Sequence, residues 1–307
     1  MRIAAPLTLL ASLLAFSVGA VGCGGGDGGA AIDADGSSTV GPFVTKAAED
    51  FKAQGGVDVT VGISGTGGGF ERFCAGETDI SNASRTIDAD EAAICQANGI
   101  EYVELRVATD ALTNVVNIEN DWATCLTVEQ LNAIWKPGSK VSNWNQVDSS
   151  FPDVALKLYG AGTDSGTFDY FTGVINGEEG ASRSDYSATE DDNVTVQGVS
   201  GDKGGLGYFG FSYFEDNQNK LKALEVDGGQ GCVAPSGATA QDGSYTPLSR
   251  PLFMYVKKSS LDTNQDLVDF VRYTLENEQT IAEEARFVAL SQAQIDEELQ
   301  KLEGGTS

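Results

Sequence analysis

The segment that indicates the fold is a short glycine-rich stretch, residues 64–70, with the sequence SGTGGGF. Residues 57–63, just before it, alternate apolar and polar side chains as a strand does. A strand that turns through small residues into a helix leaves hydroxyl groups and unpaired backbone N–H groups at the helix N-terminus. Because that end carries about half a positive charge, the stretch predicts an anion-binding site.

Two further clusters have the same character. Residues 36–40 read GSSTV directly before a helix-like segment, and residues 162–167 read GTDSGT after a strand and at the start of another helix. One such cluster alone is more often a simple helix cap. Three in one chain favour a common anionic ligand.

Strand-like and helix-like segments alternate over the rest of the chain, which indicates a fold of α/β layers. Strands are expected at residues 57–63, 79–83, 102–107, 112–118 and 252–256. Helices are expected at residues 41–54, 127–135, 165–175, 262–275 and 280–299, the last broken near Ser291. The length of 307 residues suits two lobes, and the β-rich stretches near Val107 and Leu252 are candidate crossing points.

Charge and composition exclude several classes of function. The net charge is −26, which argues against binding nucleic acid or anionic lipid. The chain has no histidine, the commonest general base and metal ligand, so a Ser-His-Asp hydrolase is excluded. We therefore expect a protein without a cofactor or metal.

The N-terminus has the pattern of an export signal. Arg2 precedes an uncharged apolar run, residues 3–20, which ends in small residues before Cys23. A transmembrane anchor is the alternative, but the run is near the lower length limit for a span. We expect residues 1–23 to be a lipoprotein signal peptide with Cys23 as the lipidated residue, and residues 24–30 to be a flexible tether. The protein would then be exported to the periplasm or outer cell surface and held to the membrane by its lipid.

Four cysteines remain after Cys23, and an exported chain favours two disulfides from the three pairings they allow. We expect Cys74–Cys95, which flanks a local helix–strand–helix segment, and Cys125–Cys232, which closes a long loop. Metal binding by these cysteines is the rival interpretation, but the chain has no CxxC spacing to support it.

Several motifs together resemble the phosphate-binding protein family of phosphate ABC importers. They span almost all of residues 35–290, and they are the segments 36–40, 64–70, 76–85 (GETDISNASR), 134–144 (from Ile134-Trp135 to Trp144), 160–171 and 204–208 (GGLGY). Any one of these motifs is weak evidence, but their combination is specific.

The resemblance implies a type II periplasmic-binding-protein fold, in which two α/β lobes are joined by two hinge strands and phosphate lies between them. Carried over to this chain, residues 31–108 and 252–307 would form lobe I, and residues 109–251 would form lobe II. The implied function is capture of inorganic phosphate and its delivery to the transmembrane permease subunits of an ABC importer, without a chemical step. We expect a monomer.

The same resemblance implies a set of phosphate-binding residues. Thr39 and Val40 match the first phosphate loop of the family, with the Thr39 hydroxyl and the Val40 N–H as donors and Ser38 as a further hydroxyl. The second loop is matched by Ser64, Thr66 and Gly67, and the third by Ser165, Gly166 and Thr167. Ser84 and Arg85, at the end of the segment 76–85, are further expected ligands.

The chain departs from the family pattern in its charges. Many members have an arginine shortly before the third loop, where this chain has Ala161-Gly162-Thr163, and an aspartate near the position of Ser84, which Arg85 follows here. We infer that Arg85 supplies the guanidinium from the opposite lobe, because its planar fork suits phosphate. Asp164 would orient Arg85 or accept the proton of the ligand. A surface ion pair is the alternative role of Arg85.

The carboxylate of Asp164, as the expected acceptor of the ligand's proton, would favour phosphate over sulfate. Phosphate keeps a proton at neutral pH and sulfate does not, so an unpaired carboxylate facing sulfate costs several kcal/mol. Sulfate, molybdate and arsenate remain alternative ligands, and arsenate shares the proton of phosphate. An exported phosphatase is the alternative of another class, but the sequence shows neither histidine nor a carboxylate cluster with the pattern of a metal site.

Overall fold

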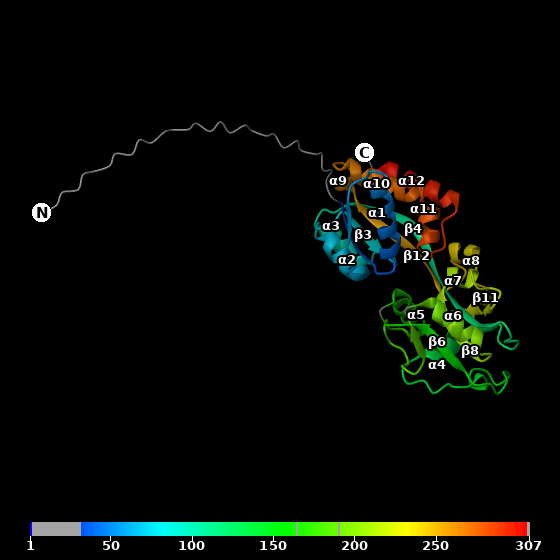
Figure 1. Ribbon diagram of the computed structural model, residues 1–307. Coiled ribbons are helices and arrows are strands. Elements are labelled where there is room, and N and C mark those ends of the chain that lie inside the picture. The colour runs from blue at the N-terminus through cyan, green and yellow to red at the C-terminus, as the bar shows by residue number, and fades with distance from the viewer. Residues whose placement is uncertain (2–31, 164, 190, 306–307) are drawn as a thin grey trace.

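The computed structural model describes residues 1, 32–163, 165–189 and 191–305. Its two α/β lobes are connected by two long strands, β4 (Tyr102–Asn117) and β12 (Ser249–Lys257), which pair antiparallel and pass between the lobes (Figure 1). Both are almost entirely buried along their central residues, as a strand shared by two cores must be. The fold class is the predicted one.

The first lobe has helices on both faces of its part of the sheet. The strands are in the order β2-β1-β3-β12-β4, with β1, β2 and β3 parallel and β12 antiparallel to β3. One apolar cluster lies under α1, α10 and α12, and another lies under α2 and α3 on the opposite face. The bounds of these elements are β1 Ile32–Gly36, α1 Gly41–Ala53, β2 Val59–Val61, α2 Gly65–Cys74, β3 Ile80–Ala83, α3 Ala89–Ala97, α9 Lys258–Leu261, α10 Gln265–Glu276, α11 Glu278–Glu284 and α12 Gln292–Gly305.

The second lobe continues the same sheet in the order β4-β8-β6-β7, with β9 also paired to β4. A separate small sheet has the order β11-β10-β5. Its core is aromatic: Phe171 stacks on Tyr208 with ring centroids 3.8 Å apart, and Trp135 packs edge-on against both. The bounds are β5 Cys125–Thr127, α4 Val128–Trp135, η1 Trp144–Gln146, β6 Lys157–Ala161, α5 Gly166–Asn176, β7 Ser187–Thr189, α6 Asp192–Gly201, β8 Gly205–Gly210, α7 Phe211–Glu215, β9 Leu221–Ala223, β10 Glu225–Asp227, β11 Cys232–Val233 and α8 Gly237–Gln241.

Most predicted elements occur within a few residues of their expected bounds, and two differences have clear reasons. The strands expected at 102–107 and 112–118 are one continuous strand, β4, because residues 108–111 stay buried and extended between the lobes. The helix expected at 280–299 is split into α11 and α12, and the break is wider than expected. Arg286 lies in this break with φ of 66°, and residue Val288 pairs with Thr109 of β4.

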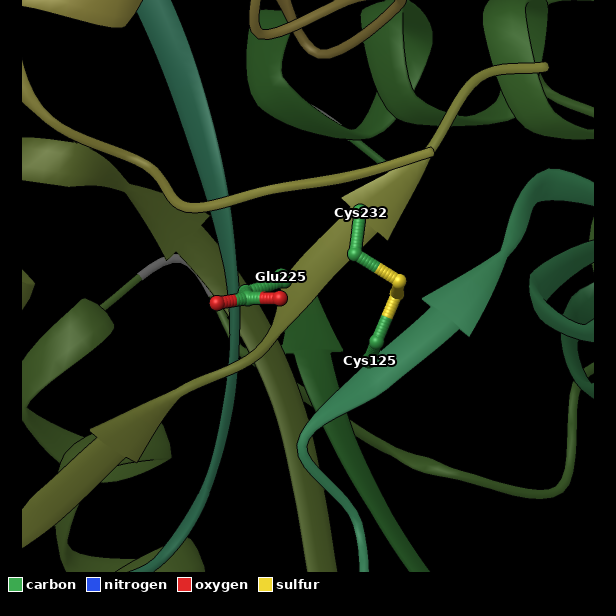
Figure 2. Close-up of side chains that lie close together, drawn as sticks. All are labelled: Cys125, Glu225 and Cys232. Carbon is green, nitrogen blue, oxygen red and sulfur yellow. A yellow bond between two sulfur atoms is a disulfide. The ribbon is translucent and has the colours of Figure 1, made fainter. Parts of the chain in front are cut away.

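The structure contains both predicted disulfides. Cys74–Cys95 joins α2 to α3 and is buried, whereas Cys125–Cys232 joins β5 to β11 across 107 residues of sequence. Figure 2 shows the carboxylate of Glu225 beside the second disulfide, with one potential ligand atom from each residue within 4.8 Å of the others. Since the two sulfurs are bonded to each other, this group offers no thiolate to a metal ion.

The predicted signal peptide, lipidation at Cys23 and the tether fall in residues outside those described. No helix in the described segments has the length and apolar character needed to cross a bilayer. The predicted lobe boundaries, after residues 108 and 251, fall inside β4 and β12. These boundaries stay predictions.

Candidate functional site

A polar cavity of about 300 Å³ lies between the two lobes beside the crossing strands. Three loops of the first lobe, the start of α5 in the second lobe and one residue of β12 enclose it. Its lining residues are Ser37, Ser38, Thr39, Ser64, Gly65, Thr66, Gly67, Gly68, Ser84, Arg85, Gly166, Asp169, Tyr170, Glu179 and Arg250.

The first loop connects β1 to α1 and presents Ser37, Ser38 and Thr39 to the cavity. Helix α1 begins at Gly41 with Pro42 in its first turn, where the missing proline N–H costs nothing. Within the described chain, no side chain caps this helix and no acidic residue lies in its first turn. The positive end of the helix dipole therefore faces the loop without a protein anion to satisfy it.

The second loop leads into helix α2, which begins at Gly65 with Ser64 as its N-cap residue. The Ser64 side chain makes no capping hydrogen bond, and the Ser64 N–H donates to the Asp35 carboxylate at 3.1 Å. The hydroxyl of Thr66 lies 3.1 Å from that of Ser84, and it accepts the Ser84 N–H at 3.3 Å. This contact fixes the loop after β3 against the start of α2, so the hydroxyls from two loops line one wall.

The third loop comes from the second lobe and meets the first loop directly. A Cβ placed on Gly166 would lie 2.9 Å from Oγ1 of Thr39, so only glycine permits this approach without a shift of Thr39. Ser165 caps α5 by accepting the Thr167 N–H at 3.2 Å. Ser165 and Thr167 line an adjacent cavity of about 250 Å³, which shares Ser38, Thr39 and Gly166 with the first.

Arg85 lines the cavity, but carboxylates of its own lobe hold it. Its two terminal nitrogens each donate to Glu91 at 2.8 Å, and Asp88 lies 3.3 Å away. The guanidinium also lies over the ring of Phe70, 5.6 Å from the centroid. Hydrogen bonding to Glu91 raises the pKa of Arg85, so this residue is a fixed cation at the cavity wall.

Arg250 is a second cation in the cavity, and sequence reasoning did not identify it. It lies on β12 with only 15% of its side chain exposed. Its guanidinium donates to Thr39 Oγ1 at 2.8 Å and to Asp110 at 3.2 Å, and it stacks over Tyr170 with 3.7 Å to the ring centroid. Arg250 thus contacts the first lobe, the hinge strand β4 and helix α5 of the second lobe.

Acidic groups balance this cation. Burial raises the pKa of Asp110, although the charge of Arg250 opposes the rise. Two more carboxylates, Asp169 and Glu179 of the second lobe, line the cavity opposite the first-lobe loops. An anion bound between these walls would meet hydroxyls, helix N-termini and guanidinium groups on one side, and groups able to accept a proton on the other.

Most of the predicted residues are gathered around this cavity. Eight line it: Ser38, Thr39, Ser64, Thr66, Gly67, Ser84, Arg85 and Gly166. The side chain of Val40 instead lies fully buried in the first-lobe core, and its N–H points to Ser37 Oγ at 3.4 Å. Asp164 is outside the described residues. The lining residues that sequence reasoning did not name are Ser37, Gly65, Gly68, Asp169, Tyr170, Glu179 and Arg250; all of them except Glu179 and Arg250 lie within quoted motifs.

Comparison with known proteins gives consistent results. Residues 24–278 match the family model described as PBP superfamily domain. The chain is 48% identical over 262 residues to protein SphX of Synechocystis sp., covering 84% of this chain and 78% of the relative. It is also 42% identical over 302 residues to the phosphate-binding protein PstS of Staphylococcus saprophyticus, covering 95% and 91% of the two chains.

Solved structures show the same fold. A possible phosphate binding protein from Planctomyces limnophilus superposes with a TM-score of 0.86 at 46% identity, covering 91% of this chain and 99% of the other. PstS from Borrelia burgdorferi superposes with a TM-score of 0.66 at 22% identity, covering 85% and 99%. The second likeness concerns the fold alone.

Proposed function

The chain belongs to the phosphate-binding proteins of the PBP superfamily, and from this premise we propose that it binds inorganic phosphate between its lobes for an ABC-type importer. The observation that carries the proposal is the meeting of three anion-suited loops, from two lobes, around one cavity that also contains Arg250. Helix N-termini and arginine are the groups that bind tetrahedral oxyanions in proteins.

Each wall of the cavity has a separate part in the proposed site. Thr39, Ser64, Thr66 and Ser84 supply hydroxyls, and the first turns of α1 and α2 supply backbone N–H groups. Arg250 supplies the principal guanidinium, because it is nearly buried and already reaches the Thr39 hydroxyl. Arg85 stays a predicted ligand, with part of its donor capacity engaged by Glu91.

Local groups explain how a chain with net charge −26 binds an anion. Interactions between exposed charges fade over roughly 8–10 Å in physiological salt. Inside a cavity away from water, charge-assisted hydrogen bonds at short range are stronger than this distant repulsion. The arrangement therefore binds a small anion despite the acidic surface.

Selectivity for phosphate requires an acceptor for its proton. Asp164 remains the predicted acceptor, and Asp169 and Glu179 are carboxylates on the cavity wall that support the presence of such a group. A carboxylate in contact with sulfate would face a fully deprotonated oxygen, so we expect phosphate and arsenate to bind much more tightly than sulfate.

The wider cycle follows from the two-lobed construction. The start of α5 already meets the first loop, so closure of the lobes around β4 and β12 would complete the enclosure by bringing the second lobe onto the second loop. The closed monomer would then dock on the permease and release phosphate without a chemical step. We include in this proposal export to the periplasm or outer cell surface and a lipid anchor at Cys23.

Titration calorimetry of the purified chain with phosphate, arsenate, molybdate and sulfate tests the proposal. We expect one phosphate per chain, a comparable signal with arsenate and no saturable signal with sulfate. Absence of phosphate binding, or equal affinity for sulfate, would refute it. Incubation with phosphate monoesters tests the rival hydrolase, and steady release of phosphate would support that rival instead.

A further inference from the structure

A buried carboxylate lies directly behind the first two loops of the cavity. Asp35, the penultimate residue of β1, has 2% of its side chain exposed. Its Oδ1 accepts the N–H of Gly36 at 2.8 Å and the N–H of Ser64 at 3.1 Å. One oxygen atom therefore connects the residue that begins the first loop to the residue that begins the second, although they are 28 positions apart in sequence.

The other carboxylate oxygen is paired with a cation from the helix that follows the second loop. Arg72 of α2 donates from Nη1 to Oδ2 of Asp35, and from Nε to the exposed Glu77 at 3.2 Å. Gly62, which directly follows β2, leaves space for the Asp35 carboxylate, because a Cβ on Gly62 would lie only 2.7 Å from Oδ1 of Asp35. β1, the second loop and α2 are thus joined through a single side chain.

Arg72 neutralises the negative charge of the buried Asp35. Burial raises the pKa of Asp35, but hydrogen bonds from Gly36, Arg72 and Ser64 outweigh that effect and lower the pKa. The group is accordingly an anion at neutral pH, next to loops whose ligand is an anion. Without a paired cation, it would repel the ligand through a poorly screened interior.

We propose that Asp35 and Arg72 are positioning residues for phosphate, in which Asp35 holds the first two loops in register and Arg72 neutralises it. This inference rests on the proposed function of the cavity. Neither residue lines the cavity, so both act through the loops and the local electrostatic field. The pair makes a distinct prediction: removal of the arginine alone harms binding more than removal of both charges.

The test is phosphate calorimetry on the full chain, with thermal unfolding to confirm that each variant folds. Arg72→Gln leaves the carboxylate uncompensated and should weaken phosphate binding about tenfold, the scale of a lost charged partner. Asp35→Asn combined with Arg72→Gln keeps an oxygen acceptor for both N–H groups, so it should recover most of the lost affinity. Arg72→Lys, which keeps the charge, should lose less than Arg72→Gln.

Glu77→Gln is the matched control, because it removes the exposed partner of the same arginine and leaves Asp35 paired. It should bind phosphate as the wild type does. If the double variant binds as weakly as Arg72→Gln, or more weakly, the charge-balance role is wrong while the proposed function stands. A wild-type protein that does not bind phosphate would refute both.

Discussion

Arg250 is the residue on which the proposed site depends most. It contacts Thr39, Asp110 and Tyr170, which belong to the first lobe, a hinge strand and the second lobe. In the proposed site, a cation in this place would add affinity for an anion and would connect the parts expected to move on closure of the lobes. Its planar fork suits this set of contacts in a way that a lysine would not.

We predict that Arg250→Lys weakens phosphate binding by about 2 kcal/mol, because a point charge loses the paired donors and the stacking on Tyr170. Calorimetry with phosphate measures the change. Arg272→Lys is the matched control: this arginine pairs with Glu303 on the first lobe and is absent from the cavity lining. Equal affinities of Arg250→Lys and wild type would remove Arg250 from the ligand set.

Arg85 gives a second prediction at this scale. Arg85→Ala should weaken phosphate binding by at least about 2 kcal/mol, since it removes a cation from the wall and frees the carboxylate of Glu91. The measurement is again the phosphate dissociation constant. A change within experimental error would mean that Arg85 serves only its ion pair with Glu91.

At the scale of elements, the beginning of α5 is the part of the second lobe that meets the first loop. Gly166 lies against Thr39, whose hydroxyl accepts from Arg250. An added methyl group at Gly166 would displace that hydroxyl, although alanine itself suits the first turn of a helix. The contact between Gly166 and Thr39 would therefore couple the approach of the two lobes to the positions of the Thr39 hydroxyl and the Arg250 guanidinium.

Gly166→Ala should lower phosphate affinity about tenfold or more, because the added methyl group displaces Thr39, while the free energy of unfolding changes little. Calorimetry gives the affinity, and small-angle scattering with and without phosphate reports whether the lobes still close. Gly201→Ala, at the end of α6 where an added Cβ meets no atom within 4 Å, is the control. Full closure and unchanged affinity in Gly166→Ala would show that the contact with Thr39 is not limiting.

A second element-scale feature concerns stability. Glu278 at the start of α11 is fully buried and accepts the Leu290 N–H at 3.0 Å, which ties α11 to the chain before α12. Burial raises its pKa from 4.5 to about 7, against the opposing effects of that hydrogen bond and of Arg106. The folded protein therefore favours the neutral acid, whereas the unfolded chain ionises near pH 4.5.

The contribution of Glu278 to stability is thus complete below about pH 4.5 and declines as the pH rises to about 7. Its total size is about 3 kcal/mol. Glu278→Gln keeps an acceptor for Leu290 and removes the titration, so its unfolding free energy should depend less on pH across this interval. Denaturant unfolding from pH 4.5 to 8 measures the difference, with the exposed Glu276→Gln as control. Parallel pH curves for Glu278→Gln and wild type would contradict the assignment.

At the scale of the whole molecule, the two disulfides differ in access and in the length of chain they close. Cys74 and Cys95 are buried, whereas Cys232 is exposed. The Cys125–Cys232 loop spans 107 residues and the Cys74–Cys95 loop 21. A disulfide that closes a longer loop restricts the unfolded chain more. Cys125–Cys232, the more accessible disulfide, is therefore also the one with the larger effect on chain entropy.

We predict that mild reductant opens Cys125–Cys232 first, because thiolate attack requires access to a sulfur. Its loss should lower the free energy of unfolding by about 5 kcal/mol in the chain-entropy account. Alkylation followed by peptide mass analysis identifies the opened pair, and denaturant unfolding of the alkylated protein gives the stability. Earlier opening of Cys74–Cys95 would show that local unfolding of α2 and α3, and not static exposure, governs access.

The sequence alone determined much of the fold and one side of the site. Small hydroxyl residues between a strand and a helix predict an anion loop from local sequence alone, and residues of both stretches, 36–40 and 64–70, line the cavity. Periodicity located α1, α4, α5 and β12, because each buries one face or all of its length. The composition excluded histidine chemistry.

Only the tertiary structure showed which charges meet these loops. Arg250 lies 211 residues from Thr39 in sequence, and Asp35 reaches Ser64 from the end of another strand. Neither residue stands in a local pattern, because their positions follow from the antiparallel pairing of β12 with β4 and the parallel pairing of β1 with β2. Local geometry is encoded by neighbouring residues, whereas a site between lobes is encoded by the packing that brings distant segments together.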